Sequence, residues 1–595
     1  MKAVAEAERQ AREKASSAQA FTTVELESSS SSSSQASEAE GSGSDLDPDV
    51  DVRSPKRQRG ARGVVQVVTP EVVVALDRTN VSDRKAAHIF SAMASSGHLC
   101  ENVGELIISP SGIRRARIKC REALATELKD TFRPQVPLIL HWDGKIMEDC
   151  SLPGQETVDR LPVLVSVQDV VKLLAVPKLH AGTAVVMATS ILQTLDEWGL
   201  KDRISGLCFD TTVSNTGLKG RVCVLIEREL ERDLLNLACR HHVAEIVLEK
   251  VFGLHDTSKS PNIELFHHFK EYWPRVDQTS FRTAMVDEEM RSRVAEWREE
   301  VIMFATDQLH QHQPRDNYRE LLELTIIFLG GQPPKGVRFR YPGAIHRARW
   351  MSRAIYTLKM VIFREQYPMD QRPGPSRRQT RSETSWNHSE EVAIFIVQVY
   401  AKYWFQAPSS VSAPRNDPYL LKVVDDFPSK EISIAATTVF SGHLWYLSET
   451  LVGFAFFEDQ VTLEVKRKMV KNLKDKPGSK DAPKRIHSVN RPQNMDLSDL
   501  VTTFTKRFFN ILHVNEDFLQ KDPLEWAADQ KYQRSLDLVK SVRVVNDLAE
   551  RGVALMTELN DSLTKSEEQK QFLFQVVEAH RKKYSAPTKA AALNT

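Results

Sequence analysis

An apolar run that ends at a carboxylate is the feature that most constrains this chain. Residues Gly206 to Phe209 are apolar and stop at Asp210, after which come two threonines, a serine and an asparagine. This pattern predicts a buried strand and then a polar turn that opens a helix. Chemistry in open α/β sheets lies beyond the carboxyl ends of strands, so Asp210 is a candidate functional acid. The alternative is that Asp210 only caps the next helix.

Length and composition predict a globular protein of several domains. The chain has 595 residues, of which 41% are hydrophobic and 27% charged. Its net charge is +1, so any surface for nucleic acid must be local. The six cysteines form no Cys-x-x-Cys pair, which argues against a structural zinc site or a disulfide framework. With no secretory signal and no apolar run of about 18 residues, we expect no membrane partner.

Residues 1–65 are expected to be a disordered tail, because they are rich in serine and acidic residues and nearly lack aromatic side chains. Near its end the tail carries a basic cluster typical of a nuclear import signal, made of Lys56, Arg57, Arg59 and Arg62. The cluster predicts a nuclear protein. The alternative is an ordinary solvated run of charge.

Residues 66–133 have helical spacing and are a candidate DNA-binding domain. Helix starts are marked by Thr69-Pro70 and Ser109-Pro110. The second of these helices carries a cluster of cations: Arg114, Arg115, Arg117, Lys119 and Arg121. Because they cannot all share one helix face, several must be exposed, and we expect them, Arg114, Arg115 and Arg117 first, to contact DNA phosphates. The alternative is a charged surface helix.

The segment 134–250 changes to a strand pattern. Apolar strands are predicted at 136–142, 159–166 and 173–179, then a helix over 182–199 and the strand that ends at Asp210. The first of these strands ends at Asp143. Three consecutive strands favour a meander, and the later strands join through helices. This is the order of the ribonuclease H-like fold, an α/β fold with a mixed sheet, in which Asp143 and Asp210 would follow neighbouring strands.

Residues 251–430 show helical spacing and predict a large all-α insertion into that sheet fold. The core resumes over 431–470, where the apolar run 440–457 is predicted to be a helix with Glu449 as its only carboxylate before Glu458. A lone acid in such a helix is costly to bury unless a cation neutralises it, and a metal ion would do so. A basic linker over 471–495 and helices over 496–585 follow. Those last helices either complete the core or dimerise.

The order of these motifs resembles that of the hAT superfamily of DNA transposases. Asp210-Thr-Thr-Val-Ser-Asn215 is similar to the family's aspartate-centred motif, and Cys239-Arg-His-His242 to the Cys-x-x-His that follows it. Arg349-Trp350 resembles the Arg-Trp pair inside the insertion, and Ser448-Glu449 the Ser-Glu near the end of the core. The resemblance covers residues 136–465. The chain departs from the family in having no N-terminal cysteine/histidine zinc finger and in the Gly-Lys that follows Asp143.

The resemblance implies metal-dependent DNA cleavage and strand transfer at transposon ends. Asp143, Asp210 and Glu449 would be the catalytic residues and would hold Mg²⁺ or Mn²⁺, since hard divalent ions prefer carboxylate oxygens. Arg349 and Trp350 would hold a distorted DNA end. DNA is then the partner, a homo-oligomer stays open, and no small-molecule substrate is expected.

Alternatives remain at three points. Cys239 and His242 are too few ligands for zinc, so we expect them to pack or hydrogen-bond behind the strand. Glu458 competes with Glu449 as the third carboxylate; in a helix the two would face opposite sides, so only one could join the aspartates. The whole chain could also be a catalytically inactive nuclear DNA-binding or chromatin-associated protein that keeps the fold. A nuclease outside transposition is disfavoured by the helical insertion.

Overall fold

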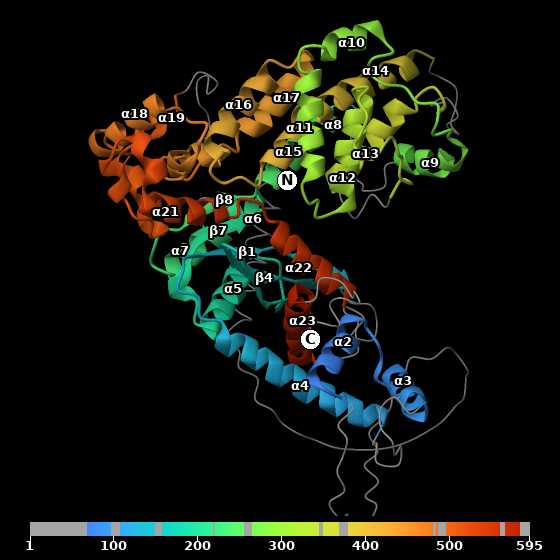
Figure 1. Ribbon diagram of the computed structural model, residues 1–595, viewed down its shortest axis with the longest axis vertical. Coiled ribbons are helices and arrows are strands. Elements are labelled where there is room, and N and C mark those ends of the chain that lie inside the picture. Colours follow the sequence, from blue (N-terminus) through green and yellow to red (C-terminus); the bar gives the residue numbers. More distant parts are fainter. Residues whose placement is uncertain are drawn as a thin grey trace, which may run out of the picture. The chain divides into compact units, whose positions relative to one another are not determined.

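A mixed five-stranded β-sheet lies at the centre of the computed structural model, in the strand order β5-β4-β1-β7-β8 (Figure 1). Its strands are β1 (Leu138–Trp142), β4 (Val163–Val167), β5 (Val170–Ala175), β7 (Ile204–Phe209) and β8 (Leu235–Ala238). Strand β4 runs antiparallel to β1 and to β5, whereas β1, β7 and β8 run parallel. The α/β class and the meander are confirmed, and β1 and β7 are neighbours as expected.

The structure describes residues 68–96, 108–148, 157–217, 220–254, 264–343, 349–367, 379–479, 483–485, 496–559 and 566–583. All of them belong to one unit, Val64–Thr595. The predicted disordered tail and the import cluster within it lie outside the described residues.

A second, three-stranded sheet has the order β2-β3-β6. Its strands are β2 (Lys145–Glu148), β3 (Thr157–Arg160) and β6 (Lys178–Leu179). The predicted strands 159–166 and 173–179 are each divided between the two sheets. Pro162 and Pro177 lie at the two breaks, and proline has no N–H to offer a β-ladder.

Helices cover both faces of the main sheet. Alternate residues of a strand point to opposite faces, and Val163 and Val165 of β4 join the large core that includes α5 (Ala184–Trp198). Leu164 faces the other way and packs with α22 (Asp547–Glu558) and α23 (Glu567–Lys583). The apolar stripe of the C-terminal helices therefore completes the core, as one of the two sequence interpretations had it.

The N-terminal helices are α2 (Pro70–Arg78), α3 (Asp83–Ser95) and α4 (Pro110–Thr131). Each begins at a side-chain cap, because the hydroxyls of Thr69, Ser82 and Ser109 accept a hydrogen bond from the first turn. Helix α4 packs along α23, through an apolar cluster that includes Ala125 and Val576 (Figure 1).

From Arg240 to Ser441 the described residues contain helices and no strand, as the spacing predicted. These helices are α8 (Arg240–Phe252), α9 (Glu264–Tyr272), α10 (Glu288–Val294), α11 (Arg298–His310), α12 (Asp316–Phe328), α13 (Arg349–Ile362), α14 (Gln379–Phe395), a π-helical turn (Ile396–Tyr400), α15 (Ala401–Gln406), α16 (Ala413–Asp425) and α17 (Lys430–Ser441).

The remaining helices are α6 (Val213–Thr216) and α7 (Val222–Glu229) between β7 and β8, and α18 (Leu463–Asp475), α19 (Leu497–Leu500), α20 (Lys506–Ile511) and α21 (Gln530–Ser541) before α22. None of the helices in the described ranges is long and apolar enough to cross a membrane.

Candidate functional site

Asp143 and Asp210 stand at the carboxyl ends of neighbouring parallel strands. His141 of β1 is paired with Cys208 of β7, and each aspartate follows two residues later on its own strand. The pairing therefore puts both aspartates at the same level of the sheet. Both are half-buried. The sequence prediction for these two positions on neighbouring strands is confirmed.

Asp210 is oriented by its own turn. Its Oδ1 atom accepts hydrogen bonds from the amide and the hydroxyl of Thr212, at 3.1 and 2.6 Å, and from Nδ2 of Asn215 at 2.6 Å. Asn215 is buried, and its Oδ1 accepts a hydrogen bond of 3.1 Å from the Trp142 indole. The turn thus links the residue before Asp143 to Asp210. The N-cap of α6 is Thr212, so Asp210 closes the turn ahead of that helix and does not cap it.

Glu449 does not lie in an apolar helix, and that prediction is wrong. Helix α17 ends at Ser441, and two 3₁₀ segments follow, Trp445–Leu447 and Leu451–Phe457. Glu449 lies in the turn between them. Residues of the second segment are buried on all sides, so packing sets the conformation there, and hydrophobicity alone is no guide to it. A Cβ at Gly453 would come within 2.4 Å of the Phe508 ring, which shows how closely the backbone is approached.

Both oxygens of the Glu449 carboxylate have hydrogen-bond donors from later in the chain. Oε1 accepts a hydrogen bond of 2.6 Å from the Ser479 hydroxyl, and Oε2 accepts one of 2.5 Å from the Thr502 hydroxyl. Glu458 is buried beside Arg415, at 4.0 Å. Because the segment is not an α-helix, the helical argument that set Glu449 and Glu458 on opposite sides does not apply.

Aromatic rings bring the Glu449 segment to the sheet. Trp142 stacks on Phe209 with 5.9 Å between ring centroids, and Trp445 meets Phe209 edge-on at 5.8 Å. Trp142 and Phe209 are the residues before Asp143 and Asp210. In the described parts of the chain, however, no three His, Cys, Asp or Glu side chains form a group that could hold a metal ion. The aspartates offer the hard oxygen donors of a divalent ion, but the predicted triad is not assembled.

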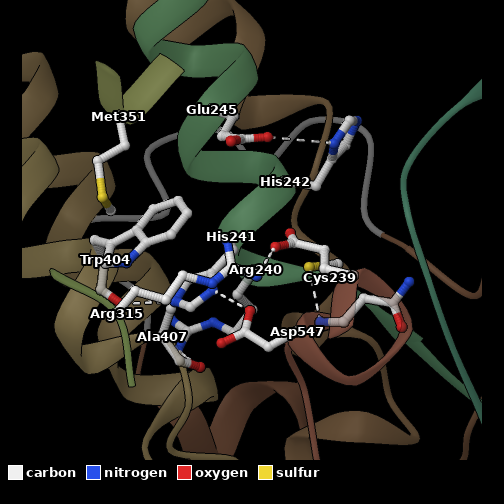
Figure 2. A network of polar contacts seen from close by, with 12 residues as sticks. Cys239, Arg240, His241, His242, Glu245, Arg315, Met351, Trp404, Ala407 and Asp547 are labelled. Atoms are coloured by element: carbon white, nitrogen blue, oxygen red, sulfur yellow. Dashed lines mark hydrogen bonds and ion pairs between the residues drawn. The ribbon is translucent and has the colours of Figure 1, made fainter. Parts of the chain in front are cut away.

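Cys239 and His242 do not form a metal pair. Cys239 is the N-cap residue of α8, and its buried Sγ accepts a hydrogen bond of 3.1 Å from the backbone amide of Asn546. Burial holds the pKa of the Cys239 thiol well above its ordinary value. His242 lies one turn before Glu245, with Nδ1 4.0 Å from Oε2 (Figure 2). Packing and hydrogen bonding account for both residues.

The two residues between them are the ones that sequence reasoning missed. Arg240 is fully buried; it donates to Asp417 Oδ1 at 2.7 Å and to the Ala407 carbonyl at 3.1 Å. His241 lies between Asp547 Oδ1, at 2.8 Å from Nδ1, and the carbonyl of Trp404, at 2.9 Å from Nε2 (Figure 2). Two basic residues at the start of a buried helix were a signal that acidic partners must exist.

Helix α4 divides its cations between the interior and the solvent. Arg117 is buried and lies 2.5 Å from Asp83 Oδ1 and 3.0 Å from Asp77 Oδ1. Arg121 is also buried and grips both oxygens of Asp77 at 2.6 Å. Arg117 therefore holds α2 and α3 on α4 and is not free to bind phosphate, which corrects the expectation for it. The helical repeat explains this, since 113, 117, 121 and 125 all lie on the buried face.

Arg114, Arg115 and Lys119 are exposed on α4. The later basic segment is mostly engaged within the protein: Arg467 forms two hydrogen bonds to Asp522, at 2.8 and 2.9 Å, and Lys484 pairs with Glu227. Helix α13 begins at Arg349, but the side chains of Arg349 and Trp350 lie outside the described residues.

Comparison with known proteins adds no family to these observations: no protein-family model and no curated protein matches the chain.

Proposed function

We propose that this protein is a transposase of the hAT type, with a ribonuclease H-like core, that cleaves DNA and joins its ends. The observation that carries the proposal is the pair Asp143 and Asp210, level with each other at the carboxyl ends of adjacent parallel strands. The strand order and the single antiparallel strand β4 between β1 and β5 are those expected of that core. Function at strand carboxyl ends is the rule in open α/β sheets.

In this proposal Asp143 and Asp210 hold a divalent ion, Mg²⁺ or Mn²⁺, which when bound would supply activation of a hydroxyl or water and stabilisation of the leaving oxygen. Asp210 has one oxygen, Oδ1, fixed by Thr212 and Asn215, and this aims the carboxylate before any ion arrives. Glu449 would join the aspartates after it exchanges its contacts with Ser479 and Thr502.

DNA would be held by cations outside the strand ends. Arg114, Arg115 and Lys119 are exposed within six residues of α4, and each phosphate contact they make would lower the magnitude of the salt slope of binding by roughly 0.9. Arg349 and Trp350 are proposed, by resemblance, to hold a distorted DNA end. Nuclear localisation is proposed from the basic cluster of the tail, and unchanged nuclear accumulation after alanine replacement of its four cations would exclude it.

The test of the catalytic proposal uses the full chain with Asp143→Asn, Asp210→Asn and Glu449→Gln. We expect Mg²⁺- or Mn²⁺-dependent nicking of DNA to fall by about 100-fold or more in each, and Mn²⁺ binding, followed by electron paramagnetic resonance, to be lost in both aspartate variants. Two matched exposed carboxylates, Asp169→Asn and Glu464→Gln, are the controls. Wild-type levels of nicking in the aspartate variants would remove the proposal.

A second candidate, a nuclear DNA-binding protein without catalysis, is favoured by one observation: both Glu449 oxygens are already hydrogen-bonded to hydroxyl groups. It becomes the better proposal if the purified protein binds DNA, nicks none with either ion, and still fails to do so when Ser479→Ala and Thr502→Val release Glu449.

A further inference from the structure

An open cavity lies in the helical region between the start of α11, the π-helical turn, α15 and α16. Its wall includes Trp297, Gln398, Lys402, Gln406, Asn416 and Tyr419. The cavity holds about 510 Å³ including its open mouth, a volume in the range of small-molecule sites. None of these residues belongs to the strand-end site.

Carboxamide groups line this cavity without partners. Gln398, Gln406 and Asn416 make no side-chain hydrogen bond to any other residue that the structure describes. Asn416 is only 6% exposed, and Oε1 of Gln398 is shielded from solvent with no partner. Buried polar groups are nearly always hydrogen-bonded, because leaving one unpaired costs free energy. The cavity thus offers unused donors and acceptors to a ligand.

Both helices that carry these amides depart from regular geometry at the cavity. Gln398 is the central residue of the π-helical turn Ile396–Tyr400, and such turns are rare and frequent at functional sites. Pro418 lies inside α16, between Asn416 and Tyr419, where it removes one helical hydrogen bond. The two irregularities fall on the two walls that face the same space.

The rest of the lining suits a flat, uncharged ligand. Trp297, Tyr403 and Tyr419 supply aromatic rings, and Tyr419 is exposed. Lys402 pairs with Glu300 and lies 5.2 Å from the centroid of the Tyr419 ring. Because these two charges neutralise each other, the wall presents amides and rings without an unbalanced charge.

We propose that this cavity binds a nucleobase that has left its stack. A carboxamide carries a donor and an acceptor side by side, which is the arrangement that a base edge complements. Extrahelical bases are bound by hydrogen bonds to their edges and by stacking on aromatic rings. As a site for a base of the DNA substrate, the cavity rests on the proposed function; as a site for a free nucleoside, it does not.

The test titrates the full-length protein into a DNA duplex with one bulged 2-aminopurine and into the same duplex without a bulge. We expect tighter binding of the bulged duplex and a change in 2-aminopurine fluorescence as the base meets aromatic rings. Asn416→Leu and Gln398→Leu should each reduce that preference by about tenfold and leave binding of the paired duplex unchanged. Gln311→Leu, which changes an exposed amide after α11, is the control.

A second arm measures adenosine binding by tryptophan fluorescence, with circular dichroism to verify that each variant is folded. If the protein binds no DNA but binds adenosine, and Asn416→Leu abolishes this, the base site stands and the proposed function fails. If DNA binds with no preference for the bulge, and adenosine does not bind, the base site is excluded while the proposed function is untouched. Folded variants that both keep the wild-type preference would also exclude it.

Discussion

His141 and His241 are two buried imidazoles held by consecutive residues, and they differ in charge. His141, in β1, faces Asn546 Oδ1 at 3.2 Å and the Ser166 hydroxyl at 2.8 Å. Burial lowers its pKa to about 3, so it is neutral at physiological pH. Burial would lower the pKa of His241 as well, but the Asp547 carboxylate, at 2.8 Å, holds it above its ordinary value.

The comparison shows that one partner decides the protonation state where burial is equal. A neutral imidazole has a single N–H, which suits His141, because the Ser166 hydroxyl can either donate or accept. His241 has acceptors on both nitrogens, Asp547 Oδ1 and the Trp404 carbonyl, so only the imidazolium satisfies both. Residues 546 and 547 thus join the sheet to the start of α8 by two chemically different contacts.

The largest effect is expected for Asp547→Asn, which breaks the comparison by giving both histidines an amide partner. His241 would then be buried without its carboxylate, and removal of one member of a buried pair costs about 3 kcal/mol. Urea unfolding at neutral pH measures the loss. Asp537→Asn, an exposed carboxylate on α21, should change the free energy of unfolding little; equal losses in the two variants would contradict the role assigned to Asp547.

Acid should act through His141. Its folded pKa is depressed, to about 3, so its contribution is present above the unfolded value of about 6.5 and is lost as pH falls toward 3. At pH 4 the loss relative to pH 7 approaches about 3 kcal/mol. Comparing wild type with His141→Gln in urea at both values isolates this term. An equally acid-sensitive glutamine variant would mean that other groups cause the loss.

A smaller effect is expected for Ser166→Ala, which removes the hydroxyl from Nε2 of His141. The site is fully buried, so the ring nitrogen would lack a partner, at a cost of about 1 kcal/mol. The imidazole stays neutral, because the loss changes no charge. A crystal structure of the variant checks this, since a water molecule in place of the hydroxyl would reduce the expected cost.

The smallest effect is expected at alkaline pH and concerns His241. Its folded pKa is raised, so its contribution is fully present below the unfolded pKa and is lost as pH rises through the folded value. NMR titration of the His241 ring in wild type and in Asp547→Asn follows that value directly. A lower pKa in the variant sharpens the comparison, whereas an unchanged pKa would show that Asp547 is not the deciding partner.

Local patterns predicted much of the sheet and half of the candidate site. The run that stops at Asp210, the order of strands and helices, and the adjacency of β1 and β7 all follow from periodicity and chain connection. The partners that orient Asp210 are only two and five residues away, in a turn whose composition is visible in the sequence. Interactions this short in sequence depend little on the rest of the fold.

The outcome for Glu449 and Arg117 was decided by tertiary structure. Glu449 is held by Ser479 and Thr502, 30 and 53 residues later, and Arg117 is held by Asp83, 34 residues earlier. Nothing in the local pattern distinguishes Arg117 from Arg114 until the buried face of α4 is known. The apolar run around Glu449 is surrounded by other apolar residues, so its periodicity has no solvent side to report.

The sequence by itself determined which residues start and end the elements, because caps, prolines and alternating polarity act over a few residues. Tertiary structure alone decided which charges are neutralised and by whom. His141 and His241 meet Asn546 and Asp547 across 405 and 306 residues. The reason is physical: a buried charge takes its stability from whichever groups the packed surfaces bring within hydrogen-bond distance, and that choice is made only when the surfaces meet.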